Sequence, residues 1–286
     1  MFRDNLLQGR TILITGGGTG LGREMALRFA ELGARSFLVG RREDPLRQTV
    51  RDIEAKHGRA AWFSADVRDF AAVESSLVAA EKEFQRPLGG IDTLVNNAAG
   101  NFIARTEKLS PNAFNAVVGI VLQGTFYYTL ALGRRWIAAG QSGTILNIVA
   151  TYADANCGSG FIVPSACAKA GVLAMTRSLA VEWARYHIRA NAIAPGVFQT
   201  EGAFSRLVPS KELEEKAKNS NPMKRFGRME ELTNLAAYLI SEQAGYINGE
   251  CVVIDGADWP GRAGAFNHLV NLPDSAWETW EASRKK

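Results

Sequence analysis

The chain is poor in the residues that most often build disulfide frameworks and metal sites. Its 286 residues include three cysteines and three histidines. The cysteines, Cys157, Cys167 and Cys251, are odd in number and far apart, which argues against a disulfide framework and fits a reducing compartment. The histidines are isolated from one another, so no metal site is expected.

Clusters of basic residues and long apolar runs are also missing. The net charge is +4, and the basic residues are scattered instead of gathering with aromatics, so we expect no nucleic-acid binding. No apolar run reaches the roughly 20 residues that a membrane-spanning helix needs. The first apolar segment starts at Thr11, which leaves no room for a signal or transit peptide. These absences predict a soluble, cytoplasmic protein.

Seven short apolar segments alternate with amphipathic ones. The apolar segments, at residues 11–14, 36–39, 60–63, 91–95, 144–149, 189–194 and 251–254, are typical of strands. Helices are expected between them, for example over residues 69–84, over 229–241 and onward from an N-cap at Ser110 followed by Pro111. This alternation predicts parallel βαβ units with right-handed crossovers.

The fold class follows from this alternation and from the composition. With 47% hydrophobic and 22% charged residues, and no linker rich in proline, serine or glycine, we predict a single domain over residues 1–286. It is expected to be an α/β, doubly wound Rossmann fold of about seven parallel strands with helices on both faces. A polar insertion near residues 196–222, predicted to be a substrate loop, and a tail at residues 257–286 complete it.

A glycine-rich segment follows the first predicted strand. Gly16, Gly20 and Gly22 give the pattern Gly-x-x-x-Gly-x-Gly between a strand and a helix. Glycine lets the backbone turn tightly and approach a pyrophosphate, whose negative charge is favoured at the start of a helix. The alternative is an ordinary turn between a strand and a helix. The dinucleotide site predicted here comprises Thr15, Gly16, Gly18, Thr19, Gly20, Leu21 and Gly22.

The ends of the second and third predicted strands indicate the type of nucleotide. NAD sites usually have an acidic residue after the second strand, but this chain has Arg41 and Arg42. Guanidinium groups can pair with the extra phosphate of NADP, so the sequence predicts NADPH/NADP as cofactor. Two surface arginines are the alternative. Asp66, followed by Val67, is placed to accept a hydrogen bond from the adenine amino group, and a helix cap is its alternative.

The stretch from Tyr152 to Lys169 carries the candidate catalytic groups. Tyr152 follows the apolar strand at 144–149, at the edge where parallel sheets usually bind ligands. Pro164 is suited to the first turn of a helix, and Ser165 and Lys169, four residues apart, then share one face of it. A phenol, a hydroxyl and an ammonium group can therefore converge. A packing aromatic and a surface lysine are the alternatives for Tyr152 and Lys169.

These features, together with the segments 96–100 (Asn-Asn-Ala-Ala-Gly) and 195–196 (Pro-Gly), resemble the short-chain dehydrogenase/reductase family over about residues 8–256. The family's Tyr-x-x-x-Lys motif is altered, because Ser165 stands where the tyrosine is expected. A serine is a much weaker acid than tyrosine, whose pKa is about 10. Either activity is lost or the acid has moved, and Tyr152 supports the second explanation. The resemblance implies further cofactor contacts from Asn97, Ala98, Ala99, Lys169, Pro195, Gly196, Val197 and Phe198.

A closer resemblance is to the mitochondrial-type, NADPH-dependent 2,4-dienoyl-CoA reductases. It rests on residues 96–102, 158–165 and 202–207, and on Phe266-Asn267 and Trp277-Glu-Thr in the tail. It implies that Tyr152 hydrogen-bonds the thioester carbonyl, that Lys169 holds the nicotinamide ribose, and that Ser165 supports the site. Gln123 stands where the family has an asparagine that shares the carbonyl. The resemblance also implies a homotetramer, and acyl-CoA binding by Arg68, Phe102 and Arg206.

The reaction implied by this resemblance is the reduction of a 2,4-dienoyl-CoA to a 3-enoyl-CoA. Hydride from NADPH would reach the δ carbon, and Tyr152 and Gln123 would stabilise the charge that develops on the thioester oxygen. Lys169 is expected to lower the pKa of the Tyr152 phenol through its charge. Two alternatives stay open. One is another reductase of the family acting on a different acyl-CoA or a carbonyl, and the other is a non-catalytic NADP-binding regulator.

Overall fold

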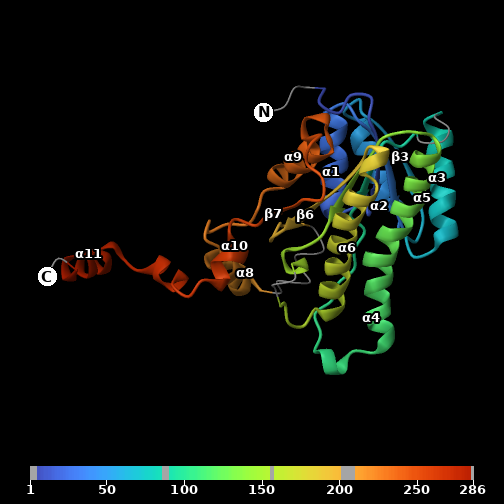
Figure 1. Cartoon of the computed structure of the whole chain (residues 1–286). Helices are drawn as coiled ribbons and strands as arrows, with labels where there is room; N and C mark the ends of the chain where they lie inside the picture. Colours follow the sequence, from blue (N-terminus) through green and yellow to red (C-terminus); the bar gives the residue numbers. More distant parts are fainter. Residues whose placement is uncertain (1–4, 86–89, 155–157, 201–209, 285–286) are drawn as a thin grey trace.

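The computed structural model describes residues 5–85, 90–154, 158–200 and 210–284, and its strands form one parallel sheet (Figure 1). The order in the sheet is β3-β2-β1-β4-β5-β6-β7. The order reverses between β1 and β4, the point at which open parallel sheets bind ligands. The predicted doubly wound fold is confirmed, with every strand end within two residues of its predicted position. The strands are β1 (Thr11–Thr15), β2 (Arg35–Gly40), β3 (Arg59–Ser64), β4 (Thr93–Asn96), β5 (Gly143–Ile148), β6 (Ile188–Pro195) and β7 (Cys251–Ile254).

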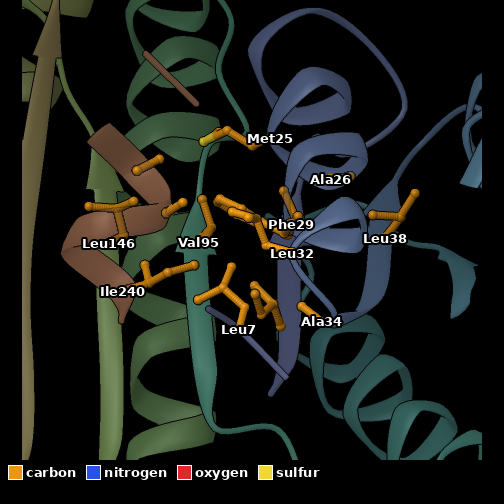
Figure 2. Packing of buried hydrophobic residues seen from close by; sticks show 14 of the residues in the cluster. Leu7, Met25, Ala26, Phe29, Leu32, Ala34, Leu38, Val95, Leu146 and Ile240 are labelled. Atoms are coloured by element: carbon orange, nitrogen blue, oxygen red, sulfur yellow. The ribbon is translucent and has the colours of Figure 1, made fainter. Parts of the chain in front are cut away.

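Helices cover both faces of this sheet. One face carries α1 (Gly20–Glu31), α2 (Glu43–Glu54) and α9 (Met229–Ile240), and α1 contacts the other two. The other face carries α3 (Phe70–Glu83), α5 (Gly124–Ala138) and α6 (Val163–Glu182). Side chains of a strand point alternately to the two faces, so each strand supplies both cores. Figure 2 shows the first core, where Met25 and Phe29 of α1 lie beside Val95 of β4 and Ile240 of α9.

The longest helical stretch runs from Pro111 to Ala138 and contains α4 (Pro111–Val118), a π-helical turn η2 (Gly119–Gln123) and α5. Ser110 caps it as predicted, because its Oγ accepts a hydrogen bond from the Ala113 N–H at 3.2 Å. With 28 residues and a mean hydropathy of 1.5, this helix alone among the described parts is long and apolar enough for a membrane span. The stretch qualifies by its average hydropathy, although it contains polar residues such as Gln123 and is no unbroken apolar run. However, 56% of its apolar window is buried in the protein core, so it is not a span.

Three short helices form the end of the chain. They are α10 (Asp258–Ala263), the 3-10 turn η6 (Asn267–Asn271) and α11 (Asp274–Ser283). In Figure 1 they form an arm that leaves the sheet beyond β7 and extends away from the rest of the molecule. The predicted insertion contains α8 (Lys211–Ser220), which lies near the start of this arm.

Candidate active site

The glycine-rich loop lies between β1 and α1, at the carboxyl end of the sheet. Gly16 and Gly20 have φ angles of 67° and 55°, in the left-handed region that favours glycine. A Cβ atom at Gly22 would lie 2.3 Å from the carbonyl oxygen of Gly16, so only glycine fits there. The backbone is therefore open to a close approach at the start of α1, as a bound pyrophosphate requires.

The segment after β4 braces this loop. The Oγ1 of Thr15 accepts hydrogen bonds from the N–H groups of Asn97 and Ala98, each at 3.0 Å. The Asn97 side chain in turn donates to the carbonyl oxygens of Thr15 and Gly16, at 3.1 and 3.3 Å. Asn97 and Ala98, which the resemblance assigns to the cofactor, thus fix the shape of the loop that would hold it.

Two hollows flank the loop and bring several predicted residues together. One, of about 370 Å³, is lined by Gly16, Gly18 and Thr19 together with Arg41 and Arg42. The two arginines therefore lie beside the phosphate loop, in a position that fits an additional phosphate. The residues present thus fit NADP.

The second hollow, of about 470 Å³, contains two residues that the sequence analysis missed. Gln199 and Thr200 line it together with Thr19, Gly20 and Arg23. Their place just after the Pro195-Gly196 pair was the available signal. Val197 and Phe198, predicted to contact the cofactor, line a different hollow with Arg225, Asp255 and neighbouring residues.

Asp66 and Arg68, predicted to bind adenine and acyl-CoA respectively, form an ion pair with each other. The guanidinium of Arg68 donates to both carboxylate oxygens of Asp66, with a shortest distance of 2.6 Å. These hydrogen bonds hold the pKa of Asp66 below its usual range, although burial acts in the opposite direction. Asp69, not Asp66, caps α3, so the cap alternative for Asp66 is wrong. Val67 is buried against Gly124.

The candidate catalytic groups come from η3 (Thr151–Ala153) and the first turns of α6. The hydroxyl oxygens of Tyr152 and Ser165 lie 3.1 Å apart and share a hydrogen bond. Ser165 is 2% exposed and Lys169 7% exposed. The ammonium of Lys169 donates to the carbonyl oxygen of Ile148, at the end of β5. The register predicted from the sequence thus directs Ser165 and Lys169 inward from one face of α6, with Tyr152 against the serine.

Burial sets the electrostatics of this group. It lowers the pKa of Lys169 to about 8, since a charged ammonium is poorly solvated in the protein interior. Burial also raises the pKa of Tyr152, and the hydrogen bond with Ser165 offsets this only in part. The predicted lowering of the phenol pKa is therefore wrong, because desolvation of the phenolate dominates.

Gln123 ends the π-helical turn η2, which the sequence analysis did not predict. Its side chain is exposed and, within the described parts of the chain, forms no hydrogen bond with Tyr152. A Cβ atom at Gly119 would lie 3.3 Å from the Cδ of Arg68 and 3.5 Å from the Oε1 of Gln123. Gly119 thus leaves room for both side chains, of which Arg68 is predicted to bind acyl-CoA and Gln123 to share the thioester carbonyl. Single π turns inside α-helices are frequent at functional sites.

Of the remaining predicted substrate residues, Phe102 is among the described residues and Arg206 is not. Phe102 is 37% exposed on the segment that follows β4. This segment is tied to the start of α6 by a hydrogen bond of 2.9 Å from the Ala104 N–H to the carbonyl oxygen of Phe161. Arg206 lies outside the described residues.

Known proteins are similar to this chain over most of its length. The family described as "Enoyl-(Acyl carrier protein) reductase" matches residues 16–256. A Bacillus subtilis protein named "Probable 2,4-dienoyl-CoA reductase [(2E)-enoyl-CoA-producing]" is 45% identical over 88% of this chain and 98% of its own length. A Caenorhabditis elegans protein named "Probable 2,4-dienoyl-CoA reductase 3 [(3E)-enoyl-CoA-producing]" is 40% identical over 98% of this chain and 88% of its own length.

A solved structure shows the same fold with a nucleotide. It is a gluconate 5-dehydrogenase from Burkholderia cenocepacia in complex with NADP and tartrate. It is 32% identical, with a TM-score of 0.79, and the match covers 89% of this chain and 97% of the other.

Proposed function

Because the chain belongs to the short-chain dehydrogenase/reductase family, we propose that it uses NADPH to reduce a 2,4-dienoyl-CoA to a 3-enoyl-CoA. The observation that carries this proposal is the hydrogen bond between Tyr152 and Ser165. This hydrogen bond places the Tyr152 phenol beside Ser165, the residue that stands at the family's usual tyrosine position. An acid displaced in this way suits a substrate whose polarised oxygen lies far from the carbon that receives the hydride.

NADPH is the proposed cofactor, and its nicotinamide supplies the hydride when it is bound. Arg41 and Arg42 support this choice, since they line one hollow with the glycine loop and present guanidinium groups to an additional phosphate. The loop itself admits no side chain at Gly22, which fits a closely held pyrophosphate.

The role proposed for Tyr152 is to donate a hydrogen bond to the thioester oxygen. When the δ carbon of the dienoyl group gains a hydride, the electron pairs of the conjugated chain shift and negative charge develops on that oxygen. Since burial raises the pKa of Tyr152, the phenol keeps its proton at neutral pH and remains a donor. Lys169, with a pKa of about 8, is mainly charged at that pH and adds a positive charge on the buried side of α6 that also carries Ser165.

The product depends on which carbon accepts the final proton. Protonation of the α carbon gives a 3-enoyl thioester, whereas protonation of the γ carbon gives a 2-enoyl thioester. The two relatives described above are named for different products, so the product is a separate test. We infer the 3-enoyl product, because the donors proposed here act at the thioester end of the conjugated system.

Assembly and location belong to the proposal as well. We infer a homotetramer in the cytoplasm. The half-exposed Phe126 on α5, which lies next to Tyr127 and outside the site described above, supports an interface between copies. Light scattering after size exclusion tests the tetramer, and fractionation of cells tests the location.

The decisive experiment follows NADPH oxidation with a 2,4-dienoyl-CoA. Tyr152→Phe should lower turnover at least about 100-fold, because it removes a donor to the developing charge. Tyr246→Phe is a matched control, since Tyr246 is fully exposed near the amino ends of β5 and β6. Faster turnover of a 3-ketoacyl thioester would favour another reductase of the family. NADPH binding without turnover of either substrate would favour a regulator.

A further inference from the structure

The C-terminal arm ends in a helix, α11, that buries none of its side chains against the described parts of its own chain. In α11, Trp277 and Trp280 are 36% and 39% exposed, and their rings stack at 5.3 Å. None of the residues of α11 is buried, and Figure 1 shows the helix far from the sheet. A helix of ten residues is marginal by itself in water, so these exposed indoles indicate a docking surface.

The start of the arm, in contrast, is held in place. The Asn267 side chain donates to the carbonyl oxygen of Gly261 at 2.9 Å. The Asn221 side chain, from the turn after α8, donates to the carbonyl oxygen of Asp255 at 2.8 Å. These contacts hold the start of the arm, and its outer part extends away from the sheet (Figure 1).

A complementary surface lies where the segment after β4 meets the residues just before α6, the helix that carries Ser165 and Lys169. We call it the lip, and it consists of Phe102, Ile103 and Phe161 with Arg105 and Lys108. The three apolar side chains are 37%, 58% and 61% exposed. The hydrogen bond between the Ala104 and Phe161 backbones, described above, makes the two segments one surface. Both cations are exposed, and among the described residues neither forms an ion pair.

The charges of the two surfaces are also complementary. Asp274, Glu278 and Glu281 share one side of α11, next to the side with the two tryptophans. Among the residues that the structure describes, these carboxylates form no ion pair. The lip offers apolar side chains beside two cations, which match the indoles and the three carboxylates of α11. The helix ends in Arg284, whose guanidinium lies over the Trp280 ring at 5.2 Å.

We propose that α11 of one copy docks on the lip of a second copy and so completes the mouth of that copy's active site. Its indoles cover the apolar part of the lip, and its carboxylates face Arg105 and Lys108. Each copy has one arm and one lip, so a reciprocal exchange is closed and leaves neither surface exposed. This inference goes beyond the proposed reaction and does not depend on it.

Crosslinking between differently tagged, co-expressed chains tests the exchange. In a background with the three native cysteines replaced by serine, one chain carries Ala276→Cys on α11 and the other carries Thr106→Cys beside the lip. A short bismaleimide should join the two cysteines, and so the two differently tagged chains. The crosslinking rate should be about 100-fold higher than for free chains at about 10 µM, because docking raises the effective concentration of one cysteine near the other to about 1 mM. Tyr246→Cys in place of Thr106→Cys is the control, since Tyr246 lies near the amino ends of β5 and β6.

Two results would overturn the proposal. One is a rate of crosslinking between the two tagged chains that is no higher than the rate with the Tyr246→Cys control. The other is a link that forms only within a chain carrying both substitutions, which would mean that the arm folds onto its own lip. Adding Trp277→Ala and Trp280→Ala to the arm should reduce the rate to the control level. The assay uses neither cofactor nor substrate, so its failure is separate from failure of the proposed reaction.

Discussion

Replacement of Lys169 by methionine should stabilise the protein in a pH-dependent way while it abolishes turnover. The folded-state pKa of Lys169 is about 8, against 10.5 for a free lysine. This difference corresponds to about 3 kcal/mol by which the fold disfavours the charged ammonium at neutral pH. Lys169→Met removes that cost but leaves the Ile148 carbonyl without its donor, which costs about 1–3 kcal/mol at every pH.

The sign of the pH dependence separates these two effects. Between pH 8 and 10.5 the unfolded chain binds more protons at Lys169 than the folded one, so this residue makes the native protein more stable as pH rises. The stability of Lys169→Met relative to the native protein should therefore fall by about 2 kcal/mol between about pH 7 and pH 9.5. The carbonyl effect is constant and cancels in this comparison.

Urea unfolding at a fixed protein concentration measures both free energies at each pH. Lys216→Met removes an exposed lysine of α8 and is the control. It measures how the loss of a surface charge changes the free energy of unfolding under the same conditions. A stability difference between Lys169→Met and the native protein that stays the same at both pH values would refute the lowered pKa. It would also remove the argument that burial controls the electrostatics of the site.

Three further substitutions test other parts of the structure. Ser165→Ala removes the hydrogen bond to Tyr152 and should lower kcat about tenfold with little change in KM; steady-state kinetics with an unchanged kcat would contradict this role. Gly22→Ala drives a Cβ atom into a loop carbonyl and should abolish NADPH binding in calorimetry, whereas Gly158→Ala, in open space, should not. Two arginines lower the pKa of Glu231 to about 2, so the stability it provides is present above pH 4.5 and is lost as pH falls towards 2. Glu231→Gln should flatten that part of an acid titration of the melting temperature.

Much of the fold could be predicted because its signals are local. Apolar segments bounded by turn residues predict strands, and their alternation with amphipathic segments permits few arrangements other than a parallel, doubly wound sheet. The π turn at residues 119–123 could not be found in this way, because it changes one backbone register inside a helix whose apolar pattern continues on both sides. The arm beyond β7 was expected as a tail, but its direction depends on contacts with the turn after α8.

The sequence by itself determined the parts of the site that depend on short-range geometry. The glycine loop needs conformations that other residues rarely adopt, and the spacing of Ser165 and Lys169 places them on one helix face. Only the tertiary structure decided which groups meet across the fold and how strongly water is excluded from them. It brought Asn97 against Thr15, 82 residues earlier in the chain, and it buried Tyr152 so that the pKa of its phenol rises instead of falling. Pairing and desolvation depend on neighbours far away in the chain, which no local pattern records.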